Sequence, residues 1–230
     1  MRWLLALAAA VFAVPAVAAE PTPVIGVGIV SADEKLVFLP AKDGGVEAVD
    51  LMFGKTQWTN KVVGQPAGAS EKVLFTWAGD EKQANAFRVF AMDAATGKPL
   101  GKSELIELPE WATTAKAAGR TFRTAVVDDG DTAIVVWQAS AAKKDAEGVA
   151  LVDFKTGKTT PTKNGKPRDA EFKAGPAGGF ANTVGMYEFQ RSEEVPAPKP
   201  GAAAVTKVTF IVLKGKKEYW KRELPGNPAP

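Results

Sequence analysis

Asp50-Leu-Met-Phe-Gly54-Lys55 is the first of three copies of one short pattern, in which an Asp is followed four residues later by Gly-Lys. The other copies are Asp93-Ala-Ala-Thr-Gly97-Lys98 and Asp153-Phe-Lys-Thr-Gly157-Lys158, and a looser fourth copy, without the Asp, ends in Gly215-Lys216. Each Asp follows a run of strand-forming residues, at 46–49, 87–92 and 149–152. The Asp side chain can accept hydrogen bonds from the next backbone amides, and the Gly can adopt the left-handed conformation that reverses the chain. The pattern therefore predicts a repeated β-hairpin.

A phosphate-binding loop is the alternative interpretation of the same letters. Three segments read Gly-Lys followed by Thr or Ser, namely Gly54-Lys55-Thr56, Gly101-Lys102-Ser103 and Gly157-Lys158-Thr159. A phosphate loop needs a further Gly five positions before its Gly-Lys, so that successive amides can surround the phosphates. Those positions hold Val49, Thr96 and Val152. The sequence therefore favours hairpins over a nucleotide site.

Residues 1–19 have the layout of a secretory signal peptide. Arg2 supplies an early positive charge, residues 3–14 are largely apolar, and residues 17–19 are small, as a cleavage site requires. The apolar run is shorter than the roughly 20 residues of a membrane-spanning helix. We expect residues 1–19 to be cleaved and residues 20–230 to form a single exported domain without a membrane span, periplasmic or extracellular.

The composition argues against most catalytic chemistry. The 230 residues include no Cys and no His, so the usual ligands of zinc, haem and copper and the usual general base of nucleophilic catalysis are missing. The formal net charge of +3 is small and spread along the chain, which argues against a nucleic-acid groove. The carboxylate pairs Glu104/Glu107 and Glu193/Glu194 lie in segments expected at the surface. We expect a protein that is not an enzyme, with no catalytic, cofactor-binding or metal-binding residue.

The spacing of the turns indicates an all-β repeat architecture. The turn glycines Gly54, Gly97, Gly157 and Gly215 are 43, 60 and 58 residues apart. The first spacing matches the roughly 40–50 residues of a four-stranded propeller blade, and the longer spacings predict insertions. The expected insertions are a short helix at 111–118, a loop at 138–147 and Gly/Pro-rich stretches at 160–184 and 195–201. Residues 21–30 are expected to be either a closing strand or a linker.

The stretch from Gly45 to Trp58 resembles the blade signature of PQQ-type, quinoprotein-like β-propellers. Ala48, the Asp-to-Gly-Lys turn and Trp58 are the positions that carry the resemblance. The later copies keep the turn but have Leu100 and Thr160 at or near the Trp position, and the fourth copy recovers Trp220. The resemblance implies an all-β, antiparallel, propeller-like fold of about four blades. Such a set could form a small closed ring, a half-ring that pairs with itself or a degenerate fragment, and we expect an open or irregular assembly whose free strand edges favour self-association or a partner strand.

The family includes quinone- and calcium-binding alcohol dehydrogenases as well as non-catalytic scaffolds, such as the propeller component of the outer-membrane assembly machinery. The dehydrogenases carry an adjacent pair of disulfide-bonded cysteines under the cofactor, and this sequence has none. The repeated hairpins without convergent reactive residues therefore favour an exported, non-catalytic binding or scaffold protein with a protein partner and no cofactor. The alternatives are a subunit or remnant of a quinone- and calcium-dependent dehydrogenase, or a carbohydrate-binding module.

The acidic cluster at 128–131 and the tryptophans are two further candidate sites. Asp128-Asp129-Gly130-Asp131 is the densest acidic cluster, but an EF-hand loop would need Glu at position 139, where Ala stands. A hairpin turn accounts for the cluster without a metal. Of the tryptophans, Trp58 and Trp220 are expected between blades, and Trp77 and Trp137 in the core. Trp111, in an insertion, is the candidate for a surface contact such as a carbohydrate, although packing is the favoured interpretation there too.

Overall fold

The computed structural model describes residues 22–23, 28–41, 44–61, 64–115, 117–161, 183–184, 186–194 and 207–224. Throughout this described part the regular elements are β-strands, β1 to β18, arranged in four antiparallel sheets. The signal-peptide region and the stretch at 195–201 lie outside the described residues, as does most of the stretch at 160–184. A helix long and apolar enough to cross a membrane was not found among the described residues.

Each sheet is one blade, and the blades are numbered I to IV along the chain. Blade I contains β2 (Ile29–Val30), β3 (Leu36–Pro40), β4 (Val46–Asp50) and β5 (Thr56–Asn60). Blade II contains β6 (Gln65–Ala69), β7 (Val73–Gly79), β8 (Ala86–Asp93), β9 (Pro99–Lys102) and β10 (Ile106–Glu107). Blade III contains β11 (Arg120–Asp129), β12 (Thr132–Ala141), β13 (Lys144–Val152) and β14 (Thr159–Pro161). Blade IV contains β1 (Thr22–Pro23), β15 (Thr183–Val184), β16 (Tyr187–Glu194), β17 (Lys207–Lys214) and β18 (Lys217–Leu224).

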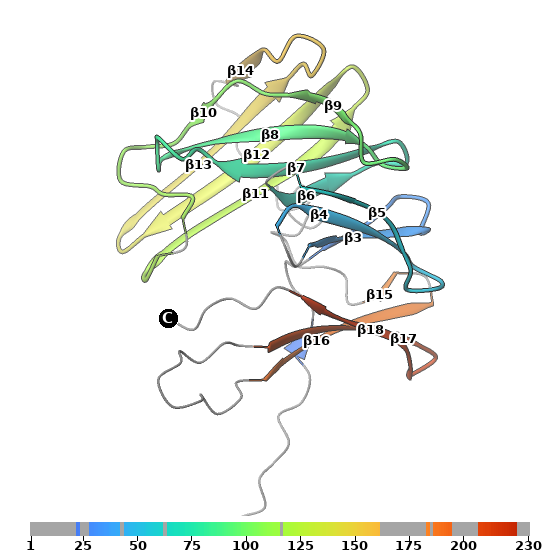
Figure 1. Ribbon diagram of the computed structural model, residues 1–230. Coiled ribbons are helices and arrows are strands. Elements are labelled where there is room, and N and C mark those ends of the chain that lie inside the picture. The colour runs from blue at the N-terminus through green and yellow to red at the C-terminus, as the bar shows by residue number, and fades with distance from the viewer. Residues whose placement is uncertain are drawn as a thin grey trace, which may run out of the picture.

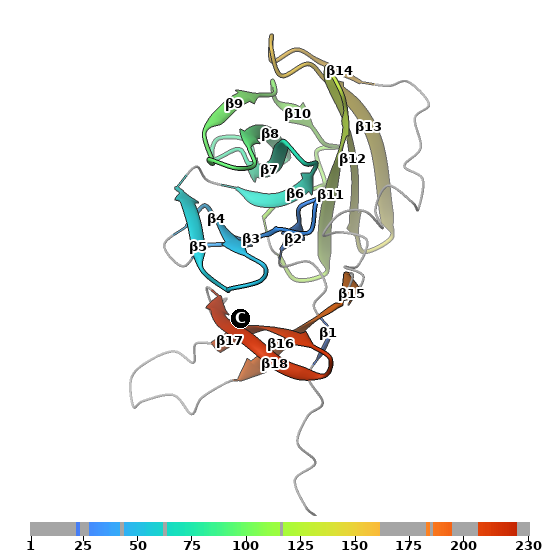
Figure 2. The same cartoon turned by 90° about the vertical axis from the view of Figure 1, so that its right-hand side faces the viewer.

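The blades pack side by side in the order IV, I, II, III (Figures 1 and 2). Strand β1, near the start of the chain, pairs with β16, so blade IV combines the two ends of the chain and lies against blade I. Residues 22–23 thus form the closing strand that was one of the two expectations for this region. The inner strands β2, β6 and β11 lie near the middle of the assembly (Figure 2).

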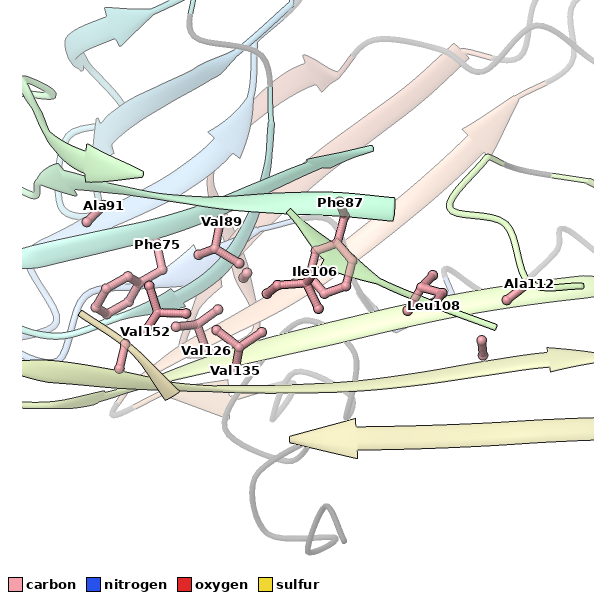
Figure 3. Packing of buried hydrophobic residues seen from close by; sticks show 13 residues of the cluster. Phe75, Phe87, Val89, Ala91, Ile106, Leu108, Ala112, Val126, Val135 and Val152 are labelled. Atoms are coloured by element: carbon pink, nitrogen blue, oxygen red, sulfur yellow. The ribbon is translucent and has the colours of Figure 1, made fainter. Parts of the chain in front are cut away.

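Apolar side chains fill the three junctions between neighbouring blades. The II–III junction is the largest, and its core runs from Phe75 and Ala91 at one end to Leu108 and Ala112 at the other (Figure 3). The far face of blade III carries a smaller buried cluster around Ala125 and Val136, and within the described residues that cluster includes no side chain of blade IV. The prediction of an all-β, propeller-like assembly of about four blades that is open or irregular is therefore confirmed.

Two local expectations were wrong. Residues 138–147 are not a loop, because β12 continues to Ala141 and β13 starts at Lys144, which makes blade III longer than its neighbours (Figure 1). Successive side chains of β12 alternate between the two faces of the blade. Ala139 packs on the core, and Gln138 on the other face accepts a hydrogen bond from Arg123. The region at 111–118 forms turns rather than a helix in its described residues. Its backbone instead bonds across to blade II, where the amide of Thr114 donates to the carbonyl of Ala84 at 3.0 Å.

Candidate protein-interaction surface

The repeated Asp-to-Gly turn is a tight hairpin connection, as predicted. In the copies beginning at Asp50, Asp93 and Asp153, the Gly amide donates to the Asp carbonyl at 2.8, 2.8 and 2.7 Å. The Gly φ angles are +65°, +68° and +79°, which lie in the left-handed region that favours glycine. These turns therefore end the third strand of each blade and start the outermost one.

The turns also connect neighbouring blades, because tryptophans from one blade dock on the turn of the next. The Trp58 indole of blade I donates to the Ala94 carbonyl of blade II at 3.0 Å. The Trp220 indole of blade IV donates to the Leu51 carbonyl of blade I at 2.9 Å. A Cβ atom on Gly97 would lie 2.5 Å from the Trp58 ring, so the turn glycine also makes room for the indole. The expectation that Trp58 and Trp220 pack between blades is confirmed.

The first turn differs from the other two at the residue before the glycine. The Thr96 hydroxyl donates to the Asp93 carboxylate at 2.7 Å, and the Thr156 hydroxyl donates to the Asp153 carboxylate at 2.9 Å. These hydroxyl bonds are the largest cause that lowers the pKa of Asp93 and of Asp153. Phe53 occupies this position in the first turn and can donate only its backbone amide, at 2.8 Å from Asp50 Oδ1. The first turn has therefore exchanged a side-chain hydrogen bond for an aromatic ring.

That ring belongs to a group of exposed apolar side chains at the junction of blades I and IV. Phe53 and Met52 are 64% and 49% exposed, and on blade IV Met186 and Tyr219 are 64% and 43% exposed. The two halves meet at Trp220, which follows Tyr219 in the chain and packs against Gly54, the residue after Phe53. We name these four residues the I–IV surface. They are four of the six large hydrophobic side chains that are exposed in the described part of the chain.

The blade IV half of the surface has a cation beside its rings. The rings of Tyr187 and Tyr219 have centroids 6.3 Å apart. Lys214 Nζ lies 5.6 Å from the centroid of Tyr187 and 5.4 Å from that of Tyr219, within the range of a cation–π interaction. The surface thus combines aromatic rings, flexible thioethers and a positive charge.

Polar contacts behind the surface fix blade IV on blade I. Arg222 Nη2 donates to the Thr56 hydroxyl at 2.8 Å, and Nη1 lies 3.3 Å from Glu47 Oε2. The second contact lacks hydrogen-bond geometry and acts through charge alone. Because both charged side chains are largely shielded from water, this pair is screened less than one at the open surface.

The structure places the candidate residues of the sequence elsewhere, in structural roles. Residues 128–131 form the β11–β12 hairpin turn, in which the Gly130 amide donates to Asp128 Oδ1 at 3.2 Å. Asp131 pairs with Lys155 at 2.7 Å. The hairpin interpretation is confirmed, and no group of three or more potential acidic, His or Cys metal ligands occurs among the described residues.

The remaining tryptophans and carboxylates are also in structural positions. Trp77, Trp111 and Trp137 are half-buried and pack against the II–III core, which confirms the packing interpretation for all three. The Glu104 carboxylate accepts the amide of Thr159 on the next blade at 3.2 Å. Glu107 and Glu194 are exposed, and the side chain of Glu193 lies outside the described part.

Comparison with known proteins identifies the family. A family model described as the outer membrane protein assembly factor BamB matches residues 2–179, which is well over half of the chain. The chain belongs to the BamB family. The predicted resemblance to PQQ-type repeat proteins is therefore confirmed. No curated protein matches this BamB-family chain.

Several solved propellers are similar to this BamB-family chain. BamB from Moraxella catarrhalis is 10% identical with a TM-score of 0.31, and the match covers 88% of this chain and 63% of that one. The Dos1 propeller is 11% identical with a TM-score of 0.37, covering 86% and 46%. Quinohemoprotein alcohol dehydrogenase from Comamonas testosteroni is 14% identical with a TM-score of 0.34, covering 86% and 34%. The chain thus spans less than two thirds of the length of each structure.

The I–IV surface does not follow from the sequence predictions, which make the three turns equivalent and place a contact surface in the insertions, around Trp111. The available signal was the difference between copies, since Met52-Phe53 stands where the others have Ala95-Thr96 and Lys155-Thr156. Two large apolar residues at the tip of a hairpin turn are the feature that indicates a contact surface.

Proposed function

We propose that this BamB-family chain is an exported, non-catalytic scaffold that binds a protein partner through the I–IV surface. The observation that carries the proposal is Phe53, which is exposed at the tip of a turn that would be better bonded with Thr. Proteins that depart from a local structural rule tend to do so at functional positions. Aromatic residues and Met are also enriched in the cores of protein interfaces. The family description, an outer membrane protein assembly factor, supports a proposed partner among proteins that assemble the outer membrane.

We also propose where the protein is located in the cell. Residues 1–19 act as a signal peptide that is removed, and residues 20–230 form the single mature domain, periplasmic or extracellular. Intact mass measurement of the protein purified from the envelope fraction should give a chain that begins at Glu20. A mature protein that still carries residues 1–19 would contradict this part of the proposal.

The substitution Phe53→Thr tests the surface, because folding and binding should change in opposite directions. The new hydroxyl can donate to Asp50, so the free energy of unfolding should rise by about 0.5–1.5 kcal/mol. Partner binding should fall about tenfold or more, as expected for loss of an aromatic anchor. Chemical denaturation measures the first quantity, and quantitative capture from an envelope extract, with tagged mature protein as bait, measures the second.

Leu151→Thr is the matched control, since Leu151 is also an exposed apolar residue but lies on blade III. The control should capture partners as the wild type does. If the folded Phe53→Thr variant captures the same proteins in the same amounts, the I–IV surface is not the binding site. If wild-type bait retains nothing above an unrelated propeller, the scaffold function itself is wrong.

A further inference from the structure

The outermost strand of blade II carries no tryptophan at the II–III junction. In the I–II and IV–I junctions this position holds Trp58 and Trp220. In blade I, Phe38 pairs with Ala48, and Ala48 pairs with Trp58. In blade II the same register runs from Phe75 through Ala91 to Gly101. Gly101, the residue next to Leu100, therefore occupies the tryptophan position.

An aromatic ring from the opposite blade partly replaces the missing indole. The residue after the turn Asp is Ala94 in blade II but Phe154 in blade III. The Phe154 and Phe75 ring centroids are 5.5 Å apart, close to the 5.9 Å between Trp58 and Phe38 in the sister junction. A Cβ atom on Gly101 would lie 2.3 Å from the Phe154 carbonyl oxygen. With the backbone of Phe154 in this position, residue 101 has no room for a side chain.

Because Gly101 stands at the tryptophan position and Phe154 fills only part of the space, an open pocket of about 160 Å³ remains between blades II and III. Its walls are apolar, and its rim is polar; the walls are Val73, Phe75, Ala91, Leu100 and Phe154, and the rim is Asp128, Gly130, Asp131, Thr132 and Lys155. Phe75 and Ala91 lie together at one end of the II–III core (Figure 3). In the I–II junction the corresponding residues, Leu36, Phe38, Ala48 and Ala94, belong to the same cluster as Trp58, whose ring lies against Phe38 and whose indole N–H donates to Ala94. The I–II junction thus shows that such surroundings accommodate an aromatic ring.

We infer that this II–III pocket binds a single aromatic ring presented by the side chain of a polypeptide. The volume suits one ring, since an apolar cavity of about 150 Å³ holds benzene. It is below the roughly 300–1,000 Å³ of small-molecule sites, so a ring in this pocket needs further contacts from the chain that carries it. The polar lining residues can supply them, because the Asp128 and Asp131 carboxylates bond to Gly130 and Lys155 and keep further acceptor positions for backbone amides beside the ring. The inference depends on the proposed function in one respect, namely that a polypeptide partner supplies the ring. The pocket residues are separate from the I–IV surface.

Methyl-detected NMR on the mature protein tests the inference, with N-acetyl-phenylalanine methylamide as the probe. The probe should shift the methyl signals of Val73 and Leu100 in a saturable way. N-acetyl-leucine methylamide, which is apolar without a ring, should bind about two- to tenfold more weakly. Toluene, a free aromatic molecule, separates the two sources of a ring, and it should bind no more tightly than the blocked amino acid.

In the Leu100→Trp variant the larger side chain should fill the pocket. The affinity for the probe, followed by the Val73 methyl signals, should fall at least tenfold. Leu151→Trp, an equally conservative change at an exposed leucine of blade III, should leave binding unchanged, as should Phe53→Thr. Three results would overturn the inference: no saturable shift at Val73, equal binding to the Leu100→Trp variant, or binding of toluene without binding of the blocked phenylalanine. Because Phe53→Thr does not touch the pocket, failure here and failure of the I–IV surface are separate outcomes.

Discussion

In the second and third copies of the repeated turn, local hydrogen bonds favour the ionised form of Asp93 and Asp153 and lower the pKa of each. The Thr96 hydroxyl, and after it the Thr96 amide, lowers the pKa of Asp93 below its ordinary value of 3.8. A carboxyl whose pKa is lower in the folded state contributes stability that is fully present above the unfolded value. The contribution is lost as the pH falls below 3.8 and through the folded pKa. The turn should therefore be weakened by acid and unaffected by pH changes around neutrality.

Thr96→Val tests this account of a single residue. The substitution removes the hydroxyl donor and retains a branched side chain of similar size, so the pKa of Asp93 should rise towards 3.8. Asp153 is the internal control, because its own partner Thr156 is unchanged. Carbon-detected NMR titration of the Asp carboxyl groups measures both. An Asp93 titration that does not move in the variant would show that the hydroxyl bond is not the cause.

At the scale of the element, the first two copies of the repeated turn also hold a tryptophan of the neighbouring blade. Gly97 and Gly130 both have positive φ, +68° and +78°, but only Gly97 faces the indole of Trp58. Gly130→Ala should therefore show only the backbone strain, about 1–2 kcal/mol. Gly97→Ala should lose more, because the methyl group would also displace Trp58 from the Ala94 carbonyl. Urea denaturation of the two variants measures the difference, and equal losses would mean that the indole is not held by the turn.

The II–III junction allows a second test at this scale. Gly101→Trp alone should be strongly destabilising, because its Cβ would lie 2.3 Å from the Phe154 carbonyl oxygen and the Phe154 ring occupies the place beside Phe75 that an indole would need. Combined with Phe154→Ala, which keeps the carbonyl but removes the ring, as at Ala94 in the neighbouring blade, the same change should be tolerated better. A double-mutant cycle should give a favourable coupling energy of about 0.5–3 kcal/mol. Additive losses would indicate that the two positions did not exchange one aromatic ring.

At the scale of the whole molecule, the buried clusters of the described residues join neighbouring blades, and blade IV shares its cluster with blade I. Phe210 and Phe87 are both fully buried, in the I–IV and II–III cores respectively. Phe210→Ala should lower stability by about 3–5 kcal/mol and should first expose the amides of β16–β18 to hydrogen exchange. Phe87→Ala should instead affect β7–β8 and β11–β13. Exchange that rises uniformly over all blades in the Phe210→Ala variant would show that the assembly unfolds as one unit.

Much of the local structure followed from the sequence because its contacts are short-range. The hairpin turns bond residues within five positions of one another, so an Asp, a Gly and flanking strand formers are sufficient to predict them. The two local errors, at 111–118 and 138–147, arose where partners from other segments decide the backbone. Thr114 bonds to Ala84, and the end of β12 is maintained by pairing with β11.

The sequence by itself determined the all-β class, the repeated turns, the between-blade tryptophans and the family. The tertiary structure decided which blade lies beside which, because those contacts join distant residues: Trp220 and Leu51 are 169 positions apart. It alone showed that Phe53 is exposed on a turn whose Gly54 packs against Trp220 of blade IV, and that the Phe154 ring lies against Phe75 across from Gly101. Side-chain exposure and the filling of a junction depend on what packs from the opposite blade, and no local pattern encodes that partner.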